Sequence, residues 1–222
     1  MTPRQETATT DGSLRAADGR VPGERGQATR GRLLDATAEL LTTTSYRDIR
    51  VVEVARGAGT SPATFYQYFP DIESAVLELA RQMADEGTAL ARTIDDAGWT
   101  GRDGYPLALR LVDAFLAFWD SHHAVLRVVD LAIVEGDARF RELRTRLLNP
   151  VTVALRDVIA GVKARGRHPD SVDPTAQAAV LVSMLAHVAE HQHGLEVWGV
   201  RTPAARESMA RIVYWSVTAK RP

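Results

Sequence analysis

The stretch VVEVARGAGTSPATFYQYF, residues 51–69, decides the fold because it holds two short helical patterns on either side of a glycine-containing turn. Apolar residues from Val51 to Ala58 recur at helical spacing, and Gly57 and Gly59 end this pattern where a left-handed residue is most easily placed. We therefore predict a first short helix that stops at the glycines.

The second pattern restarts a helix directly after the turn. Ser61 is a good N-cap, and Pro62 stands at the first helical position, where its missing N–H costs nothing. A helix is predicted over residues 63–69, with Phe65 and Phe69 facing inward because they are four residues apart. Its remaining large or polar side chains can form hydrogen bonds: Thr64, Tyr66, Gln67 and Tyr68. Two short helices joined in this way are typical of a helix-turn-helix motif.

Helical patterns flank this motif on both sides. An amphipathic helix is predicted from Thr29 to the hydroxyl-rich run at residues 42–46, and residues 1–26 are predicted to be a disordered tail. Further helices are predicted over residues 72–95, 107–120, 123–135, 137–165 with a kink at Pro150, 175–198 and 204–219. No strand pattern is found, so we predict an all-α fold with a helix-turn-helix domain at residues 27–70 and a second helical domain at residues 71–222.

The composition is that of a globular protein. The chain has 222 residues, of which 45% are hydrophobic and 25% charged, which excludes a wholly disordered or fibrous protein. It has no cysteine, and its longest uncharged stretch, residues 174–189, is too short to span a membrane. We therefore expect a cytoplasmic protein without a membrane partner. The net charge of −1 gives no bulk attraction to nucleic acid, so any DNA binding must come from a local arrangement.

The segment from Arg32 to Leu79 resembles the DNA-binding segment of the TetR family of bacterial repressors. The pieces that carry the resemblance are LLDATAELL, the VA..AGTS turn, TFYQYF, and FPDIESAVL at the start of the next helix. Within that family the sequence most resembles the actinobacterial branch that includes the regulator of ethionamide activation. The resemblance implies a homodimeric, ligand-responsive regulator, more a repressor than an activator, that binds a palindromic DNA operator and is released by a small, largely apolar effector. No cofactor and no enzymatic activity are expected.

The resemblance also implies roles for individual side chains. Thr64 and Tyr66 would hydrogen-bond phosphates, Pro62 and Ala63 would approach bases or thymine methyl groups, and Gln67 would face a base edge. Gln67 is the residue that would contribute most to sequence discrimination.

Other side chains around the motif are also given expected places. Ser61 belongs to the same surface, and Tyr68 is expected to divide its role between packing and DNA contact. The family usually has a lysine where this chain has Ile72, so a phosphate contact is lost, and Arg47 and Arg50 are candidates to replace it. Arg30 and Arg32 are either phosphate ligands or simply solvated.

The second domain is expected to dimerise and to bind the effector. Residues 175–189 are apolar nearly all round, so they must be covered on more than one side. Either this is the core helix of a monomer, or it forms a four-helix dimer interface with the last helix, as in the family; the interface residues would be Leu181, Leu185, Val188, Ile212 and Trp215. The family's regulatory domains enclose a small-molecule cavity, for which the candidate residues are Phe115, Phe118, Trp119, Met184, His187, His191 and Trp198.

Several histidines invite other interpretations. His187 and His191 are four apart with Glu190 between them and His193 nearby, but no third and fourth ligand of a closed zinc site can be identified, so no metal site is predicted. His122 is placed at the junction between two helices, in a solvated or capping position.

Two alternatives to a DNA-binding regulator remain open. One is a small-molecule-binding module with weakened DNA binding, suggested by Arg50 and Ile72. The other is an enzyme that uses His187, His191 and Glu190 as acid and base, although the chain has no nucleophile motif and no phosphate-binding glycine loop.

Overall fold

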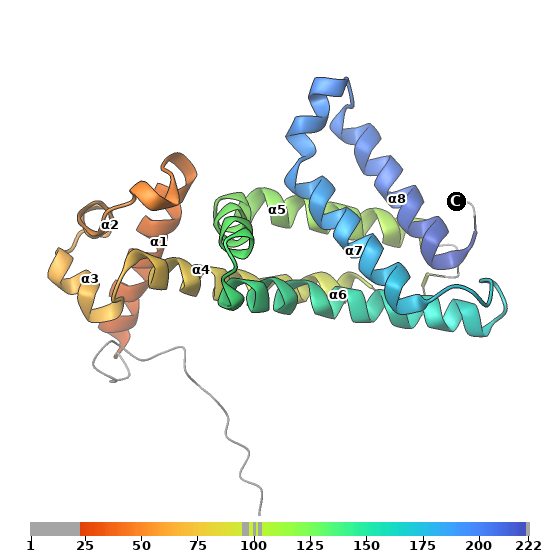
Figure 1. The fold of residues 1–222 in the computed structure, drawn as a ribbon, viewed down its shortest axis with the longest axis horizontal. Coiled ribbons are helices and arrows are strands. Elements are labelled where there is room, and N and C mark those ends of the chain that lie inside the picture. Colours follow the sequence, from red (N-terminus) through yellow and green to blue (C-terminus); the bar gives the residue numbers. More distant parts are fainter. Residues whose placement is uncertain (1–22, 95–97, 100, 102–103, 221–222) are drawn as a thin grey trace, which may run out of the picture. The chain divides into compact units, whose positions relative to one another are not determined.

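The computed structural model describes residues 23–94, 98–99, 101 and 104–220, and no strand occurs among them. The chain divides into two compact units, one ending at Leu79 and the other beginning at Ala80. This division falls inside the helix over residues 72–87, so the two compact units share one helix. The all-α fold class is confirmed (Figure 1).

The first unit contains the helix-turn-helix. Its elements are α1 (Glu24–Thr43), the 3-10 helix η1 (Tyr46–Asp48), α2 (Val51–Gly57), α3 (Pro62–Tyr68) and the first half of α4 (Ile72–Gly87). The start of α1 at Glu24 corrects the predicted start at Thr29, and its first turn lies within the predicted tail of residues 1–26. Residues 1–22 of that tail lie outside the described residues.

Local chemistry explains why α3 starts where it does. Gly59 has a φ of +63°, the left-handed conformation that ends α2. Ser61 Oγ then accepts a hydrogen bond from the Thr64 backbone N–H at 3.2 Å, and Pro62 is the first residue of α3. The helix is held by Phe65 and Phe69, which are 0% and 3% exposed. The predicted cap, turn and inward face of this helix are confirmed.

The second unit is built from longer helices. After α4 ends at Gly87 the chain continues as the 3-10 helix η2 (Thr88–Thr93), so the helix predicted to reach residue 95 is shorter than expected. The remaining elements are α5 (Gly104–Val134), α6 (Ala138–Ala164), α7 (Pro174–Glu190), the 3-10 helix η3 (Gln192–Trp198) and α8 (Thr202–Thr218). Helix α5 packs against α7 and α8, and α6 packs against α7 and η2. The helix predicted over residues 175–198 therefore ends at Glu190, and η3 connects α7 to the antiparallel α8 (Figure 1).

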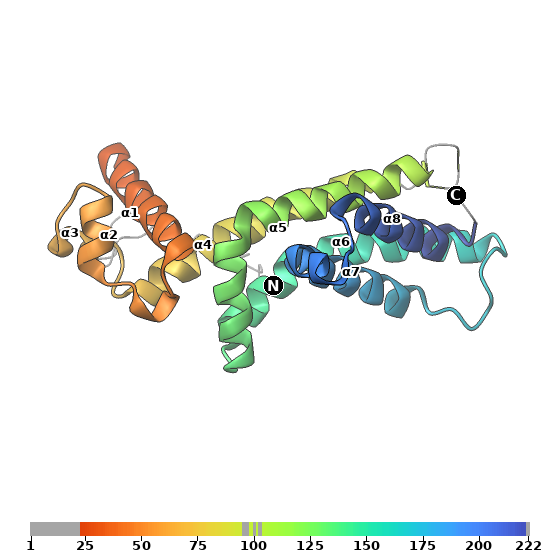
Figure 2. The same ribbon diagram turned by 90° about the horizontal axis from the view of Figure 1, so that it is seen from above.

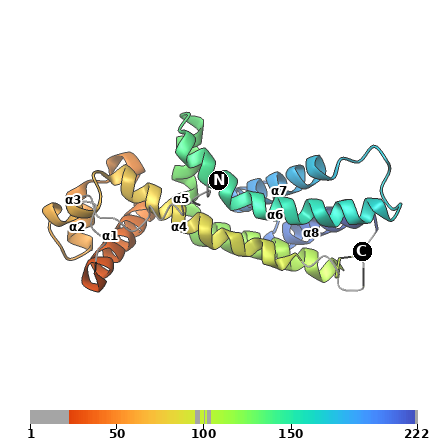
Figure 3. The same ribbon diagram turned by 90° about the horizontal axis from the view of Figure 1, so that it is seen from below.

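Helix α5 is one continuous helix where the sequence predicted two. Its ribbon nevertheless changes direction part-way along (Figures 2 and 3). Within α5, three side chains in succession bond carbonyls of the preceding turn: Ser121 Oγ donates to Ala117 O at 2.9 Å, His122 Nδ1 lies 2.9 Å from Phe118 O, and His123 Nδ1 lies 3.0 Å from Asp120 O. Such contacts disturb the helical ladder and bend a helix without ending it. His122 is thus inside a helix and not at a junction.

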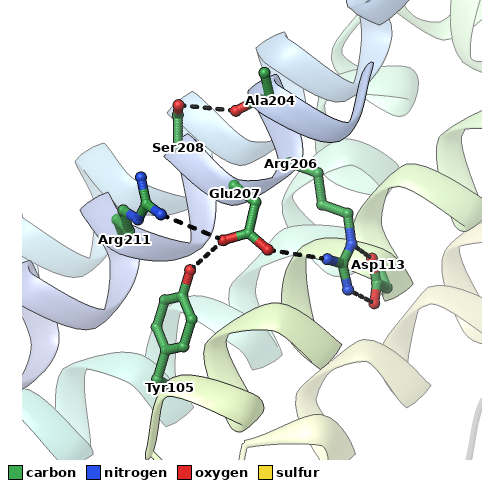
Figure 4. A network of polar contacts seen from close by, with 7 residues as sticks. All are labelled: Tyr105, Asp113, Ala204, Arg206, Glu207, Ser208 and Arg211. Carbon is green, nitrogen blue, oxygen red and sulfur yellow. Dashed lines mark hydrogen bonds and ion pairs between the residues drawn. The ribbon is translucent and has the colours of Figure 1, made fainter. Parts of the chain in front are cut away.

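A polar network ties the first half of α5 to α8 (Figure 4). The Tyr105 hydroxyl donates to Glu207 at 2.5 Å, and Arg206 binds both carboxylate oxygens of Asp113, with Nη2 to Oδ2 at 2.6 Å. Arg211 lies 3.8 Å from the same Glu207 carboxylate. Burial, reinforced by Glu207, raises the pKa of Tyr105.

Among the described residues, no helix is both long and apolar enough for a membrane span.

Candidate nucleic-acid interface and ligand cavity

The outer side of α3 presents the side chains predicted to contact DNA. Ser61, Pro62, Ala63 and Gln67 are exposed, and Tyr66 is 54% exposed. These side chains are exposed while Phe65 and Phe69 are buried, so the helix can offer them to a groove without unfolding.

Two residues of the same helix are half-buried. The Thr64 hydroxyl lies 3.0 Å from Ser61 Oγ, so it already has a partner within the cap. Tyr68 is also half-buried, in keeping with the mixed role expected of it.

The arginines around the motif differ in how far their side chains are free to contact DNA phosphates. The Arg30 guanidinium is 2.8 Å from Glu78 and lies over the Phe69 ring at 5.4 Å, so it holds α1 to α4 and is not a solvated phosphate ligand. Arg47 is exposed. Arg50 is also exposed, but its Nη2 donates to Glu53 at 3.1 Å.

The Arg50 and Glu53 pair also caps α2. The Arg50 backbone N–H donates to the Glu53 carboxylate at 3.1 Å, which is one half of a capping box, while the Arg50 side chain has no acceptor for the N–H groups of the first turn. The hydrogen bond from the Arg50 side chain lowers the pKa of Glu53 and raises that of Arg50. A phosphate contact by Arg50 would therefore exchange one anionic partner for another.

The second unit contains a cavity of about 390 Å³ between α5 and the end of α7. Its size is in the range of small-molecule sites. Apolar and ionisable side chains share its lining: Trp119, Asp120, His123, Leu126, Arg127, Ala189, Glu190, His191, Gln192 and His193. The cavity can therefore accept a ligand with both an apolar and a polar part.

Only two of the seven predicted pocket residues line this cavity, Trp119 and His191. The other five lie elsewhere: Phe115 is buried and stacked on Trp119, Phe118 lines a second, more open cavity of about 320 Å³, Met184 is half-buried, His187 is exposed, and Trp198 is 79% exposed on η3. The missed residues of α5 lie at helical spacing from Trp119, namely 123, 126 and 127. The predicted helix break near residue 121 concealed that pattern.

Polar groups without full partners gather beside the cavity. The Trp119 indole N–H is buried and has no hydrogen-bond partner among the described residues. Arg144 lies 5.6 Å from the Trp119 ring and 2.9 Å from Asp130. Burial, together with the neighbouring Glu190 carboxylate, raises the pKa of Asp130 to about 6 against the opposing effect of Arg144.

The outer side of α7 and α8 is apolar and exposed in the single chain. Val180 is 68% exposed, Ile212 42% and Trp215 45%. The predicted interface residues Leu181 and Leu185 are instead 3% and 0% exposed, because they belong to the side of α7 that packs on its own unit, and Val188 is half-buried. Of the five residues predicted for a dimer interface, Ile212 and Trp215 are therefore exposed, whereas Leu181 and Leu185 are buried within their own unit.

Comparison with known proteins assigns the chain to a family. The family model "Bacterial regulatory proteins, tetR family" matches residues 33–79, and the model "Tetracyclin repressor-like, C-terminal domain" matches residues 90–222. The HTH-type transcriptional regulator EthR of Mycolicibacterium smegmatis is 29% identical over 196 residues, which cover 84% of this chain and 88% of EthR. EthR of Mycobacterium tuberculosis is 28% identical over 152 residues, 68% of each chain.

Solved structures show the same fold. A TetR-family regulator of Streptomyces coelicolor superposes with a TM-score of 0.66 at 15% identity, covering 87% of this chain and 82% of that one. The FadR regulator of Bacillus subtilis, determined in complex with stearoyl-CoA, superposes with a TM-score of 0.62 at 13% identity, covering 84% and 98%. Two family models together account for both units, and the chain belongs to the TetR family of bacterial transcriptional regulators.

Proposed function

We propose that this regulator binds a palindromic DNA operator as a homodimer, represses transcription there, and leaves the operator when a small molecule occupies the cavity between α5 and α7. The observation that carries this proposal is the two-sided character of α3. Phe65 and Phe69 hold its inner side, while Tyr66 and Gln67 are left exposed for DNA.

Dimerisation follows from the small size of one DNA-reading unit. A single helix-turn-helix contacts only a few base pairs, so useful affinity needs two copies on two half-sites. The exposed apolar residues Val180, Ile212 and Trp215 on α7 and α8 provide a surface that a second copy would cover.

The effector is proposed to combine an apolar body with a polar end. Trp119 and Leu126 offer apolar contact, while Arg127 and Glu190 provide charge in the same lining. The FadR structures with stearoyl-CoA and lauroyl-CoA make acyl compounds a reasonable first set of test ligands.

Helix α4 is proposed to transmit the effector signal because it belongs to both units. Its last turns are tied to the second unit: Glu86 lies 3.1 Å from His122 on α5, and Asp85 lies 2.5 Å from Arg146 on α6. A ligand that favours one position of α5 would thereby favour one position of α4.

The test is selection of bound fragments from random duplex DNA, followed by titration of a graded series of acyl compounds against the complex. We expect one enriched palindrome, a binding constant that falls steeply with salt, and release by at least one compound that the Trp119→Ala variant no longer senses. Binding of acyl compounds without any enriched DNA sequence would favour the alternative of a small-molecule-binding module with weakened DNA binding.

A further inference from the structure

Three potential metal ligands converge on the exposed end of α7. His187, Glu190 and His191 are all exposed, and one donor atom from each lies within 4.8 Å of the other two. Their spacing of three and four residues places them on one side of the helix. The structure thus brings Glu190 close enough to the two histidines to act as a third ligand.

A backbone contact prepares one imidazole for coordination. His191 Nδ1 lies 3.0 Å from the His187 carbonyl oxygen, and a carbonyl only accepts, so this nitrogen carries the hydrogen. In the neutral ring, Nε2 then holds a free lone pair. Fixing the tautomer through the second nitrogen is the arrangement found around protein-bound metals.

The two imidazole rings already lie next to one another. The ring centroids of His187 and His191 are 4.3 Å apart with an interplanar angle of 35°. Ligand atoms around a tetrahedral zinc ion are about 3.3 Å apart, as metal–ligand bonds of about 2.0–2.1 Å require. Because all three side chains are exposed, their rotation can close the remaining distance.

From these contacts we propose that His187, Glu190 and His191 bind a divalent transition-metal cation, with Zn²⁺ as the best-suited ion. Two imidazoles and one carboxylate form a donor set that zinc accepts, with a fourth position for water. The Glu190 carboxylate has two oxygens, so its contact with Asp130 leaves one for the metal. Hard cations such as Mg²⁺ are disfavoured because two of the three donors are nitrogens.

The site lies at the wall of the cavity. Glu190 and His191 both line it, and they are the last residue of α7 and its C-cap. A bound ion would therefore fix the end of α7 where it meets η3. All three ligands come from the end of α7 and its C-cap in one chain, so the metal site does not rest on the proposed function.

The test uses the full chain without a polyhistidine tag, stripped with EDTA and titrated with ZnCl₂ by calorimetry. We expect one Zn²⁺ per chain, with affinity at least about tenfold weaker in His187→Ala, in His191→Ala and in Glu190→Gln. The matched control is His193→Ala, which removes a neighbouring imidazole with 77% side-chain exposure and should bind zinc as the wild type does. Co²⁺ substitution should give a visible spectrum that the same three substitutions abolish.

The proposal is overturned if the wild-type chain takes up no zinc, or if the His187→Ala, His191→Ala double variant binds it unchanged. It is also overturned if His193→Ala weakens binding as much as the ligand substitutions do. Circular dichroism of each variant identifies loss of folding, and none is expected because the three side chains are exposed. DNA binding of the same variants is measured separately, so a failed metal site leaves the regulator proposal intact.

Discussion

Tyr66 and Gln67 face outward because Phe65 and Phe69 face inward, and the whole presentation of α3 depends on those two buried rings. A seven-residue helix has almost no stability of its own. Packing of the rings, which lie 5.6 Å apart, therefore decides which side chains reach the groove.

Substitutions on the outer side of α3 should separate base reading from phosphate contact. Gln67→Ala should lose about 1–3 kcal/mol of discrimination at one base pair, because a glutamine amide pairs with a base edge. Tyr66→Phe should weaken binding to all sequences alike, because it removes a phosphate donor. Both effects are measured by fluorescence anisotropy on the selected operator and its single-base variants at fixed salt.

Tyr105→Phe is the matched control for this experiment. It removes the same hydroxyl from the second unit, where that group donates to Glu207. DNA affinity should be unchanged in this variant. If both variants lost the same amount of DNA affinity, the loss in Tyr66→Phe could not be assigned to a DNA contact of Tyr66.

Asp137, the N-cap of α6, gives a second prediction for a single residue. Hydrogen bonds from Arg139, with Nη2 to Oδ2 at 2.6 Å, lower the pKa of Asp137 to about 2 from 3.8. A lowered pKa stabilises the fold above the unfolded value and loses that effect as the pH falls toward 2. Asp137→Asn, which keeps a capping oxygen, should therefore be less stable than the wild type at pH 6.

Urea unfolding of both proteins at pH 6 and pH 3 measures this effect. The gap in unfolding free energy between wild type and Asp137→Asn should shrink at pH 3, and also in high salt because the pair is exposed. A difference in unfolding free energy that grows toward low pH would contradict the lowered pKa of Asp137.

At the scale of elements, boundaries set by local chemistry were predictable from the sequence and boundaries set by tertiary packing were not. Asp173 accepts hydrogen bonds from the Thr175 and Ala176 backbone N–H groups at 2.8 and 2.9 Å, as a cap before Pro174 should. The continuity of α5 through His122 could not be read from local preference, because side chains there compete for backbone carbonyls.

The candidate sites also divide into those set by local chemistry, which could be predicted, and those set by tertiary packing, which could not. The outer face of α3 was predictable, since two phenylalanines and one cap define it. The cavity was not, because its lining joins α5 to residues 189–193 at the far end of another helix. The outward side of α7 was also missed, since a helix that is apolar all round gives no pattern that distinguishes Val180 from Leu181.

The turn between α2 and α3 gives a prediction at this scale. Gly59→Ala should lower the unfolding free energy by about 1 kcal/mol or more, because its φ of +63° is left-handed. Gly31→Ala is the matched control: it lies inside α1 with no atom near its added Cβ, so it should raise stability by up to about 1 kcal/mol. Urea unfolding checks both signs, and destabilisation by both substitutions would contradict this account of the turn.

At the scale of the whole molecule, the exposed side of α7 and α8 should determine whether the protein acts as one copy or two. Val180→Asp should weaken dimerisation at least about tenfold, because it places a charge in a face that a second copy would bury. Val134→Asp is the control. Val134 is 85% exposed and is the last residue of α5, which is not one of the two helices that form this face. Sedimentation velocity across a range of concentrations gives the result, and a wild-type chain that stays monomeric would exclude the dimer.

Hydroxyl-radical footprinting of the protein on its selected duplex tests most directly the idea that two copies of α3 enter the groove. The account predicts two symmetric protected patches whose centres are about one helical turn, or a whole multiple of it, apart. It also predicts that Gln67→Ala weakens both patches together. A single patch, or protection that spreads along the duplex without a preferred sequence, would contradict it.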